Sequence, residues 1–264
     1  MHTGIRETRA HTRFERQTSD GNKIWRTDYF GPPPSPASSN SSRPDAPNTS
    51  VYTPPAAGEI RDPQAFLVEQ SPGAIVQPHF HYVDQFQVVV DGGGTLGRHD
   101  VSPISVHFAS AHTGYGPITP GPEGLKYFTL RASADETGAQ YLPANRHKML
   151  TIPKKNVLLD SIPLADPDEL RQLAQVRRSN VKQDESGLRV DVVSIPPGMQ
   201  TEISGQPKSA GLMILVISGS VLLAEQTFTP WSCMFIGNHE PGALLTGGPD
   251  GAQILALQFP MEAS

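Results

Sequence analysis

Histidine is the residue type that points most directly to chemistry in this sequence, and it is clustered. Five of the nine histidines fall within residues 79–112, namely His79, His81, His99, His107 and His112. One residue separates His79 from His81, so on an extended strand both imidazoles point to the same face. Two neutral imidazoles on a rigid wall, completed by a ligand from a neighbouring strand, suit Zn, Fe, Mn, Ni or Cu. The alternative is that these are ordinary core or surface histidines, because two histidines one residue apart also arise by chance.

Other residues near this cluster carry groups that could act in the same site. Gln85 has the same strand parity as the His79–His81 pair, whereas Asp84 is charged but points away by the same rule. Tyr115 could hydrogen-bond a substrate, although a tyrosine that only packs is commoner. Arg131 would bind a carboxylate if it faces inward, and would form a surface ion pair if it does not.

The elements that must position these residues are predicted to be short strands. In residues 65–131 the strand-like runs are AFLVEQ, PHFHYVDQFQVVV, TLGRH, ISVHFAS and KYFTLR, separated by the turn signals SPG, DGGG, DVSP and TPGPEG. Gly92–Gly94 superficially resemble a phosphate loop, but no helix pattern follows, so a turn between strands is favoured. His99, near the end of one run, is interpreted as a turn residue.

The same rhythm returns in residues 188–259, with the runs LRVDVVSI, GLMILVIS, SVLLAEQ, CMFIG and ILALQF. Repeated strands at this spacing are typical of an antiparallel sandwich or small barrel. The sequence therefore predicts two copies of one all-β architecture.

One helix is predicted between the two halves, over residues 167–178. Asp166 can cap it, Pro167 fits its first position and Glu169 completes a capping-box pattern. Arg177 and Arg178 would then favour its C-terminus. We interpret this helix as part of a linker without a catalytic role.

The N-terminal region has a different composition. Residues 31–58 contain eight prolines and six serines, which predicts an irregular, polyproline-like excursion. Residues 22–30 hold enough apolar surface for a short strand or arm, which is a candidate contact for a homodimer. Residues 1–20 are expected not to dock on a core.

Composition excludes several classes of protein. The chain has 264 residues with 21 basic and 26 acidic side chains, and its net charge of −5 weighs against a nucleic-acid binder. No apolar run approaches the ~20 residues of a membrane span, and the polar N-terminus is unlike a secretory signal. The single cysteine, Cys233, can form no internal disulfide and is expected to be a buried small hydrophobe. These features fit a cytoplasmic protein.

The spacing around the histidine pair resembles a known motif. Gly73, five residues, His79, one residue, His81, three residues, Gln85, six residues and Gly92 is similar to the first motif of the cupin superfamily, G-x5-H-x-H-x3/4-E-x6-G. The sequence departs from the motif at the glutamate, which is Gln85 here. The second cupin motif cannot be written onto this chain. Its histidine falls nearest to His112, and His107 is the competing choice.

The resemblance covers about residues 60–260 and implies a bicupin: two cupin-like, jelly-roll β-barrels with one short linker helix. Cupins hold a divalent metal through three histidines and a glutamate. This implies His79, His81 and His112 or His107 as metal ligands, with Gln85 as a weaker, uncharged ligand. Such a site would keep the full charge of the metal, with Fe2+ favoured and Mn2+, Zn2+, Ni2+ or Cu2+ as alternatives.

The second half carries no comparable set of ligands. If Gly219 ends its copy of the motif, the two histidine positions fall near Gln206 and Lys208, and the glutamate position falls near Leu212. We therefore expect an arm and irregular segment over residues 1–59, a metal-binding barrel over 60–145, a linker over 146–187 and a degenerate barrel over 188–264.

The resemblance favours a metal-dependent enzyme acting on a small oxygen-rich substrate, and most of all a dioxygenase-like oxidoreductase with Gln85 and Tyr115 near the reacting atoms. Isomerase or lyase chemistry, with the metal as a Lewis acid, is the nearest alternative. A small-ligand-binding module without catalysis is the third, and Gln85 in place of the carboxylate favours it. No helix-turn-helix pattern supports a DNA-binding regulator.

Overall fold

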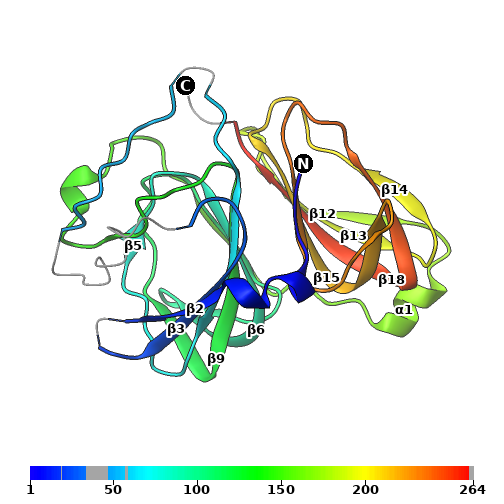
Figure 1. Cartoon of the computed structure of the whole chain (residues 1–264), viewed down its shortest axis with the longest axis horizontal. Helices are drawn as coiled ribbons and strands as arrows, with labels where there is room; N and C mark the ends of the chain where they lie inside the picture. Colours follow the sequence, from blue (N-terminus) through cyan, green and yellow to red (C-terminus); the bar gives the residue numbers. More distant parts are fainter. Residues whose placement is uncertain (19, 34–46, 57–58, 262–264) are drawn as a thin grey trace. The chain divides into compact units, whose positions relative to one another are not determined.

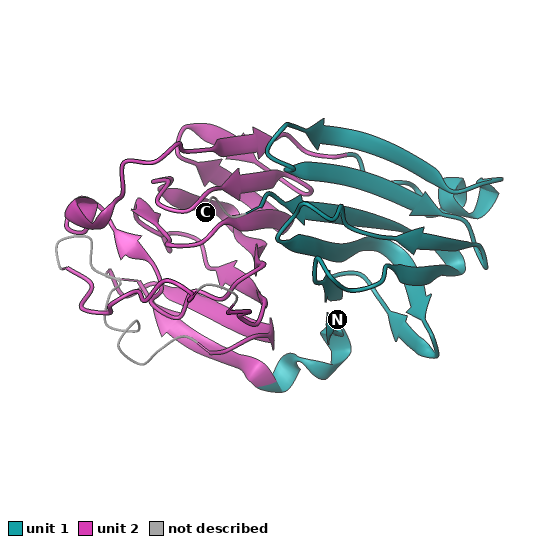
Figure 2. Ribbon diagram, turned by 90° about the horizontal axis from the view of Figure 1, so that it is seen from above, with its two compact units in different colours: residues 1–11, 163–264 teal, residues 12–162 magenta. Residues whose placement is uncertain are grey.

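The computed structural model describes residues 1–18, 20–33, 47–56 and 59–261. The chain divides into two compact units, shown in Figure 2: unit 1 comprises residues 1–11 and 163–264, and unit 2 comprises residues 12–162. Strands make up 49% of the chain and helices 6%, so the prediction of an all-β protein is confirmed. Among the described residues, no helix is both long and apolar enough to cross a membrane.

Unit 2 is built on one antiparallel sheet (Figure 1). Within the described residues its strand order is β11-β8-β6-β9-β4-β3-β2, β7 pairs with β6, and β5 and β10 form a separate small sheet. The strands are β2 (Arg13–Gln17), β3 (Lys23–Phe30), β4 (Gln64–Gln70), β5 (His79–Phe80), β6 (Gln85–Leu96), β7 (His99–Val101), β8 (Val106–Ala109), β9 (Ile118–Arg131), β10 (Gln140–Tyr141) and β11 (Asn156–Leu159). Short 3-10 turns lie at Ala10–Thr12, where the chain passes from unit 1 to unit 2, and at Arg146–Lys148.

Unit 1 repeats this plan. In the described part of the chain its sheet has the order β1-β17-β15-β18-β13-β12, with β14 paired to β18 and β16 paired to β15. Its elements are β1 (His2–Gly4), a 3-10 turn (Arg6–Thr8), helix α1 (Pro167–Gln172), β12 (Arg177–Gln183), β13 (Arg189–Ile195), β14 (Gln200–Ile203), β15 (Gly211–Leu223), β16 (Gln226–Phe228), β17 (Cys233–Ile236) and β18 (Ala243–Phe259).

The central strand pairs of the two units share one register. In unit 2 the β6–β9 ladder shifts on both sides of Gly92, and in unit 1 the β15–β18 ladder shifts on both sides of Gly219. Both glycines have positive φ, +71° and +65°, and each lies against a carbonyl oxygen of the partner strand. The equivalence of Gly92 and Gly219 that the sequence suggested is therefore present in the structure.

The glycine-rich and proline-rich runs that were predicted to be turns are instead parts of long strands. Residues 91–94 lie inside β6 and residues 119–124 lie inside β9, where the two runs face each other across the ladder. Glycine makes this possible because the backbones approach too closely for a side chain: a Cβ on Gly94 would lie 2.1 Å from the oxygen of Thr119. The actual turn follows β6, at Gly97 and Arg98, and His99 opens β7 on its far side.

The predicted helix exists but is shorter than expected. Asp166 caps it by accepting a hydrogen bond from the Asp168 amide at 2.7 Å, and Pro167 is its first residue. The helix ends at Gln172, and Arg177 and Arg178 begin β12. Residues 177–183 instead form ladder hydrogen bonds with β13, with a register shift between Asn180 and Lys182, and this pairing outweighs a weak continuing helix signal.

Residues 1–20 were expected to stay off the core, and this expectation is wrong. Residues 2–4 pair with β17 in unit 1, and residues 13–17 pair with β3 in unit 2. Ladder pairing uses backbone groups, so it does not need the apolar side chains on which the expectation was based. Within residues 22–30, Lys23–Phe30 form β3 as predicted, but β3 lies between β4 and β2, so its backbone offers no free edge to a second chain.

The sequence also led to expectations for the proline-rich stretch, the linker and the single cysteine. In the proline-rich stretch, residues 34–46 and 57–58 lie outside the described residues, and residues 47–56 form neither strand nor helix. The two units separate between Ile162 and Pro163, inside the expected linker. Cys233 is fully buried, as predicted, and burial raises the pKa of its thiol.

We predict that Gly219→Ala destabilises the protein far more than Gly198→Ala. Both glycines have positive φ, but a Cβ at position 219 would lie 2.1 Å from the oxygen of Gly251, whereas one at 198 meets nothing within 4 Å. Urea denaturation should give a loss of about 1 kcal/mol for Gly198→Ala and about 3 kcal/mol or more for Gly219→Ala. Equal losses would contradict the close-approach explanation.

Candidate functional site

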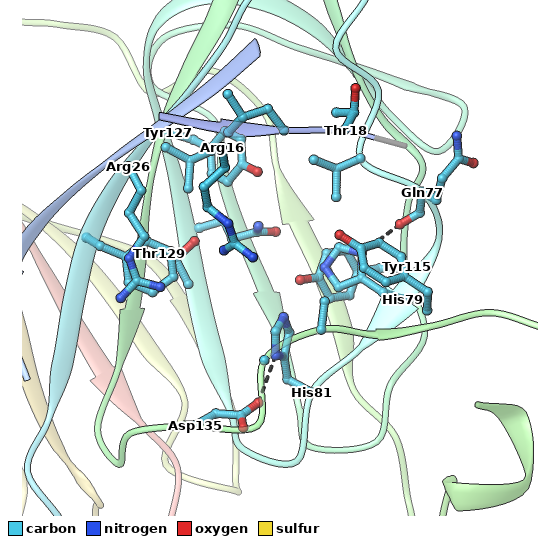
Figure 3. A pocket seen from close by; sticks show the side chains of 18 of the residues that line it. Arg16, Thr18, Arg26, Gln77, His79, His81, Tyr115, Tyr127, Thr129 and Asp135 are labelled. Atoms are coloured by element: carbon cyan, nitrogen blue, oxygen red, sulfur yellow. Dashed lines mark hydrogen bonds and ion pairs between the residues drawn. The ribbon is translucent and has the colours of Figure 1, made fainter. Parts of the chain in front are cut away.

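Unit 2 encloses a cavity of about 130 Å³ on the inner face of its sheet (Figure 3). Side chains that alternate along β3, β4 and β9 line it, together with residues of β2, β5 and the loops that follow β4 and β9. The polar and charged residues of the lining are Arg16, Gln17, Thr18, Arg26, Gln77, His79, His81, Gln87, Tyr115, Tyr127, Thr129, Arg131, Asp135 and Tyr141.

Among the described residues, one ring nitrogen of His79 is hydrogen-bonded to the protein backbone, and the other is not. Its backbone bridges to Tyr115 through two hydrogen bonds of 3.0 Å, and its Nδ1 lies 2.7 Å from the carbonyl oxygen of Gln77. A carbonyl only accepts, so Nδ1 carries the proton and Nε2 has the lone pair. Burial and the neighbouring His81 lower the pKa of His79 to about 3. The imidazole is therefore neutral at physiological pH.

His81 lies beside His79, with ring centroids 5.2 Å apart, and is anchored by a carboxylate. Its Nδ1 donates to Asp135 Oδ2 at 2.8 Å, and Asp135 also accepts from the amide of Thr137. Burial and the charge of Arg131 lower the pKa of His81 to about 4. Burial alone would raise the pKa of Asp135, but the hydrogen bond from His81 and the positive charge nearby hold it well below its usual range.

Arg131 faces inward and is 2% exposed. Its Nη1 donates to Gln64 Oε1 at 2.7 Å, and its Nη2 and Nε donate to Gln85 Oε1 at 2.9 and 3.2 Å. Nη2 also lies 3.1 and 3.2 Å from the two ring nitrogens of His81, so the guanidinium is packed against that imidazole. The sequence left open whether this arginine faces inward, and the structure places it at the centre of the site.

Gln85 connects Arg131 to Tyr115. Its Nε2 donates to the hydroxyl oxygen of Tyr115, while its carbonyl oxygen accepts hydrogen bonds from Arg131. Burial raises the pKa of Tyr115, so the phenol stays protonated. Its O–H has no acceptor among the described residues and can donate into the cavity.

The other candidate ligands are not brought to the histidine pair. His107 Nδ1 lies 2.8 Å from Gln87 Oε1, and its Nε2 lies 3.0 Å from Asn156 Oδ1, so both ring nitrogens are engaged. His112 stacks on Phe80, whose side chain alternates with those of His79 and His81, and its Nδ1 accepts from the Leu150 amide at 3.3 Å. Neither residue lines the cavity. His99 lies exposed in β7.

These contacts bear on whether the site fits a divalent metal. Among the described residues, no group of three His, Cys, Asp or Glu side chains is arranged to hold a metal ion. His79 and His81 could supply two ligands, but Gln85 is held by Arg131, and a cation on His81 Nε2 would lie beside a buried guanidinium. Like charges this close in a buried site repel strongly. The residues present do not complete the four-ligand set of the cupin motif.

Several residues of the site carried no signal in the sequence. Asp135 lies in a loop after β9, Gln64 begins β4, and Arg16 and Arg26 come from the N-terminal strands. Only the alternation of β3, which gives Arg26 the same parity as Ile24, could have pointed to an inward arginine. Nothing local indicated that this strand would join the sheet of the histidine site.

Comparison with known proteins rests on structure. No family model matches the sequence, and no curated protein matches it. A candidate dioxygenase from Nostoc punctiforme superposes with a TM-score of 0.59 at 13% identity, covering 100% of this chain and 80% of that one. Bacillus subtilis oxalate decarboxylase gives 0.55 at 10% identity, covering 100% and 78%. Vicilin from Corylus avellana gives 0.50 at 12%, covering 95% and 84%.

The chain has the bicupin fold. Similar bicupins include enzymes and a seed storage protein, so the fold alone does not fix the activity.

The two barrels of this chain have different interiors. The β15–β18 register places Leu212 and Gln258 where unit 2 has Gln85 and Arg131, and Leu212 belongs to the apolar core of unit 1. Gln258 accepts a hydrogen bond from the backbone of Gln206, near the position expected for the first histidine.

We predict that acid destabilises the protein through its buried histidines. The pKa values of His79, His81 and His107 are lowered to about 3, 4 and 4, whereas each histidine titrates near 6.5 in the unfolded chain. The unfolded state therefore binds more protons below pH 6.5. Each histidine should remove about 1.4 kcal/mol of stability per pH unit as pH falls from about 6 toward its folded pKa.

Denaturation at pH 7, 6, 5 and 4.5 would measure this loss. His79→Gln should reduce the slope of stability against pH by about one proton. A slope that is the same in wild type and variant would show that His79 is not buried in neutral form.

Proposed function

We propose that unit 2 is an enzyme that moves a proton on a small, oxygen-bearing organic substrate, in an isomerisation or lyase reaction, without a metal. The observation that carries this proposal is the pair His79 and Tyr115: one presents a lone pair and the other an O–H to the same cavity. These are the groups that proton abstraction next to a carbonyl requires.

The roles follow from the protonation states. His79 Nε2 accepts the proton from the carbon next to the substrate carbonyl. The carbonyl oxygen then becomes an enolate oxygen, to which Tyr115 donates its O–H. The proton returns to the substrate at a different carbon, or a leaving group departs, so no electron acceptor is needed. Although burial holds the pKa of His79 low, a bound substrate with negative charge raises it toward the working range.

Arg131 supplies the fixed positive charge of this site. It lies in a buried pocket, where a charge acts on a developing enolate more strongly than in water. Gln64, Gln85 and His81 hold the guanidinium in place, so it does not reorganise during the reaction. Its role is electrostatic, since its donors are already used.

We predict that the metal-stripped protein exchanges acidic C–H protons of its substrates with D2O. The measurement is NMR of small ketones and keto acids, including hydroxyacetone and levulinate, after treatment with EDTA. His79→Gln should lower the exchange rate by about 100-fold or more, because general-base catalysis contributes this much. His112→Gln is the matched control and should keep the wild-type rate, since His112 lies outside the cavity.

Exchange that appears only after Fe2+, Mn2+ or Zn2+ is added would refute the metal-free mechanism. Equal rates in wild type and His79→Gln would refute the role of His79.

A second candidate is the metal-dependent, dioxygenase-like oxidoreductase. One observation favours it: His79 and His81 both have Nδ1 anchored, to a carbonyl and to a carboxylate, as metal-binding histidines commonly do. It requires the guanidinium of Arg131 to withdraw from His81. Stoichiometric iron after anaerobic loading, lost in the His79→Ala, His81→Ala double variant and coupled to oxygen uptake, would establish it over the first candidate.

A further inference from the structure

Arg26 is a buried arginine that is only partly used by the protein. It lies on β3, where its register partner is Val68 of β4, and both side chains line the cavity. The residue is 6% exposed. Its Nε donates to Asp28 Oδ1 at 2.6 Å, but its Nη2 is buried and has no hydrogen-bond partner in the described part of the chain. An unsatisfied charged donor in a protein interior is costly and rare.

The residues around Arg26 fix the position of its guanidinium but do not complete its hydrogen bonds. Its central carbon lies 3.6 Å from the ring centroid of Phe66, which fixes its position by stacking but accepts no ordinary hydrogen bond. The guanidinium of Arg131 lies over the same ring, at 5.5 Å. The ring therefore keeps two arginines close together on the inner face of the sheet.

The cavity has an excess of positive charge near Arg26. Arg16 also lines it, and no described residue forms an ion pair with Arg16. Burial is the main reason why the pKa of Arg26 is lowered to about 10; the charges of Arg131 and Arg16 act in the same direction, and Asp28 acts against them. The two nearby carboxylates already have partners, since Asp28 binds Arg26 Nε and Asp135 binds His81. A bound anion would relieve this repulsion.

We propose that Arg26 binds a carboxylate group of the substrate, so that the substrate is a small oxo or hydroxy carboxylic acid. A carboxylate fits a guanidinium in shape and charge, and it satisfies the unpartnered Nη2. Figure 3 shows Arg16, Arg26 and Thr129 on one side of the cavity and His79 and Tyr115 on the other. A molecule held by its carboxylate at Arg26 therefore extends its other oxygen toward the reacting pair. This assignment rests on the proposed function, because it names the substrate class of the same site.

The test is calorimetric titration of the whole protein with matched pairs of probes. Each pair is a small acid and its methyl ester: acetoacetate, levulinate and 3-hydroxybutyrate with their esters. Wild type should bind at least one acid about tenfold or more tightly than its ester, as expected for a charge-assisted hydrogen bond in a buried site. Failure of every acid to bind more tightly than its ester would overturn the proposal.

Variants at positions 26 and 28 test whether Arg26 is the group that binds the carboxylate. Arg26→Gln should lower acid affinity about tenfold or more and leave ester affinity unchanged. Arg26→Lys, which keeps the charge and its pair with Asp28 but lacks the planar fork, should lose most of the acid preference. Asp28→Asn removes the competing carboxylate and should keep that preference. Circular dichroism checks that each variant folds. If both Arg26 variants fold and keep the acid preference, the anchor is not Arg26.

Failure of the carboxylate anchor at Arg26 can be distinguished from failure of the proposed enzymatic function. Acid binding that depends on Arg26, with no proton exchange in any probe, would refute the catalytic role of His79 but keep the carboxylate anchor. Proton exchange in acids and esters at equal rates, unaffected by Arg26→Gln, would keep the enzyme and refute the anchor.

Discussion

The buried guanidinium of Arg131 is the interaction on which the rest of the site depends. It contacts two amide side chains and one imidazole, and these groups come from β4, β6 and the segment around β5. Removing one of these acceptors would leave a buried charged donor unsatisfied, which costs about 1–3 kcal/mol or more. The charge therefore fixes Gln85, and Gln85 in turn orients the hydroxyl of Tyr115. Through His81 it also fixes the position of Asp135.

The two barrels show that one backbone plan can hold two kinds of interior. Gly92 and Gly219 provide the same irregularity in their central strands, so the strands bend in the same place. In unit 1 the inward positions carry Leu212, Ile214 and Ile254, which pack as an apolar core. In unit 2 the inward positions carry amides, histidines and arginines around a cavity. Because the interior of unit 1 is a packed apolar core, we place the proposed chemistry in the cavity of unit 2.

The sequence predicted well what depends on local periodicity. Strand alternation placed His79 and His81 side by side, and the capping pattern located the start of the helix at Pro167. It failed where distant segments meet. The glycine run 91–94 was interpreted as a turn because its pairing with residues 119–124 is not visible in either run alone. Likewise, Arg26 reaches the site only because β3 pairs with β4, across a long proline-rich connection.

Gln85 and Arg131 are best understood together. The cupin motif has a glutamate where this chain has Gln85, and a glutamate there would meet Arg131 as a buried ion pair. Such a pair would neutralise the guanidinium and compete with any anionic substrate for it. Glutamine keeps the hydrogen bonds but adds no charge, so the positive charge of Arg131 is left to act on the cavity. The substitution that weakens a metal site therefore strengthens a site for anions, and the unpartnered nitrogen of Arg26 on the same sheet face follows the same logic.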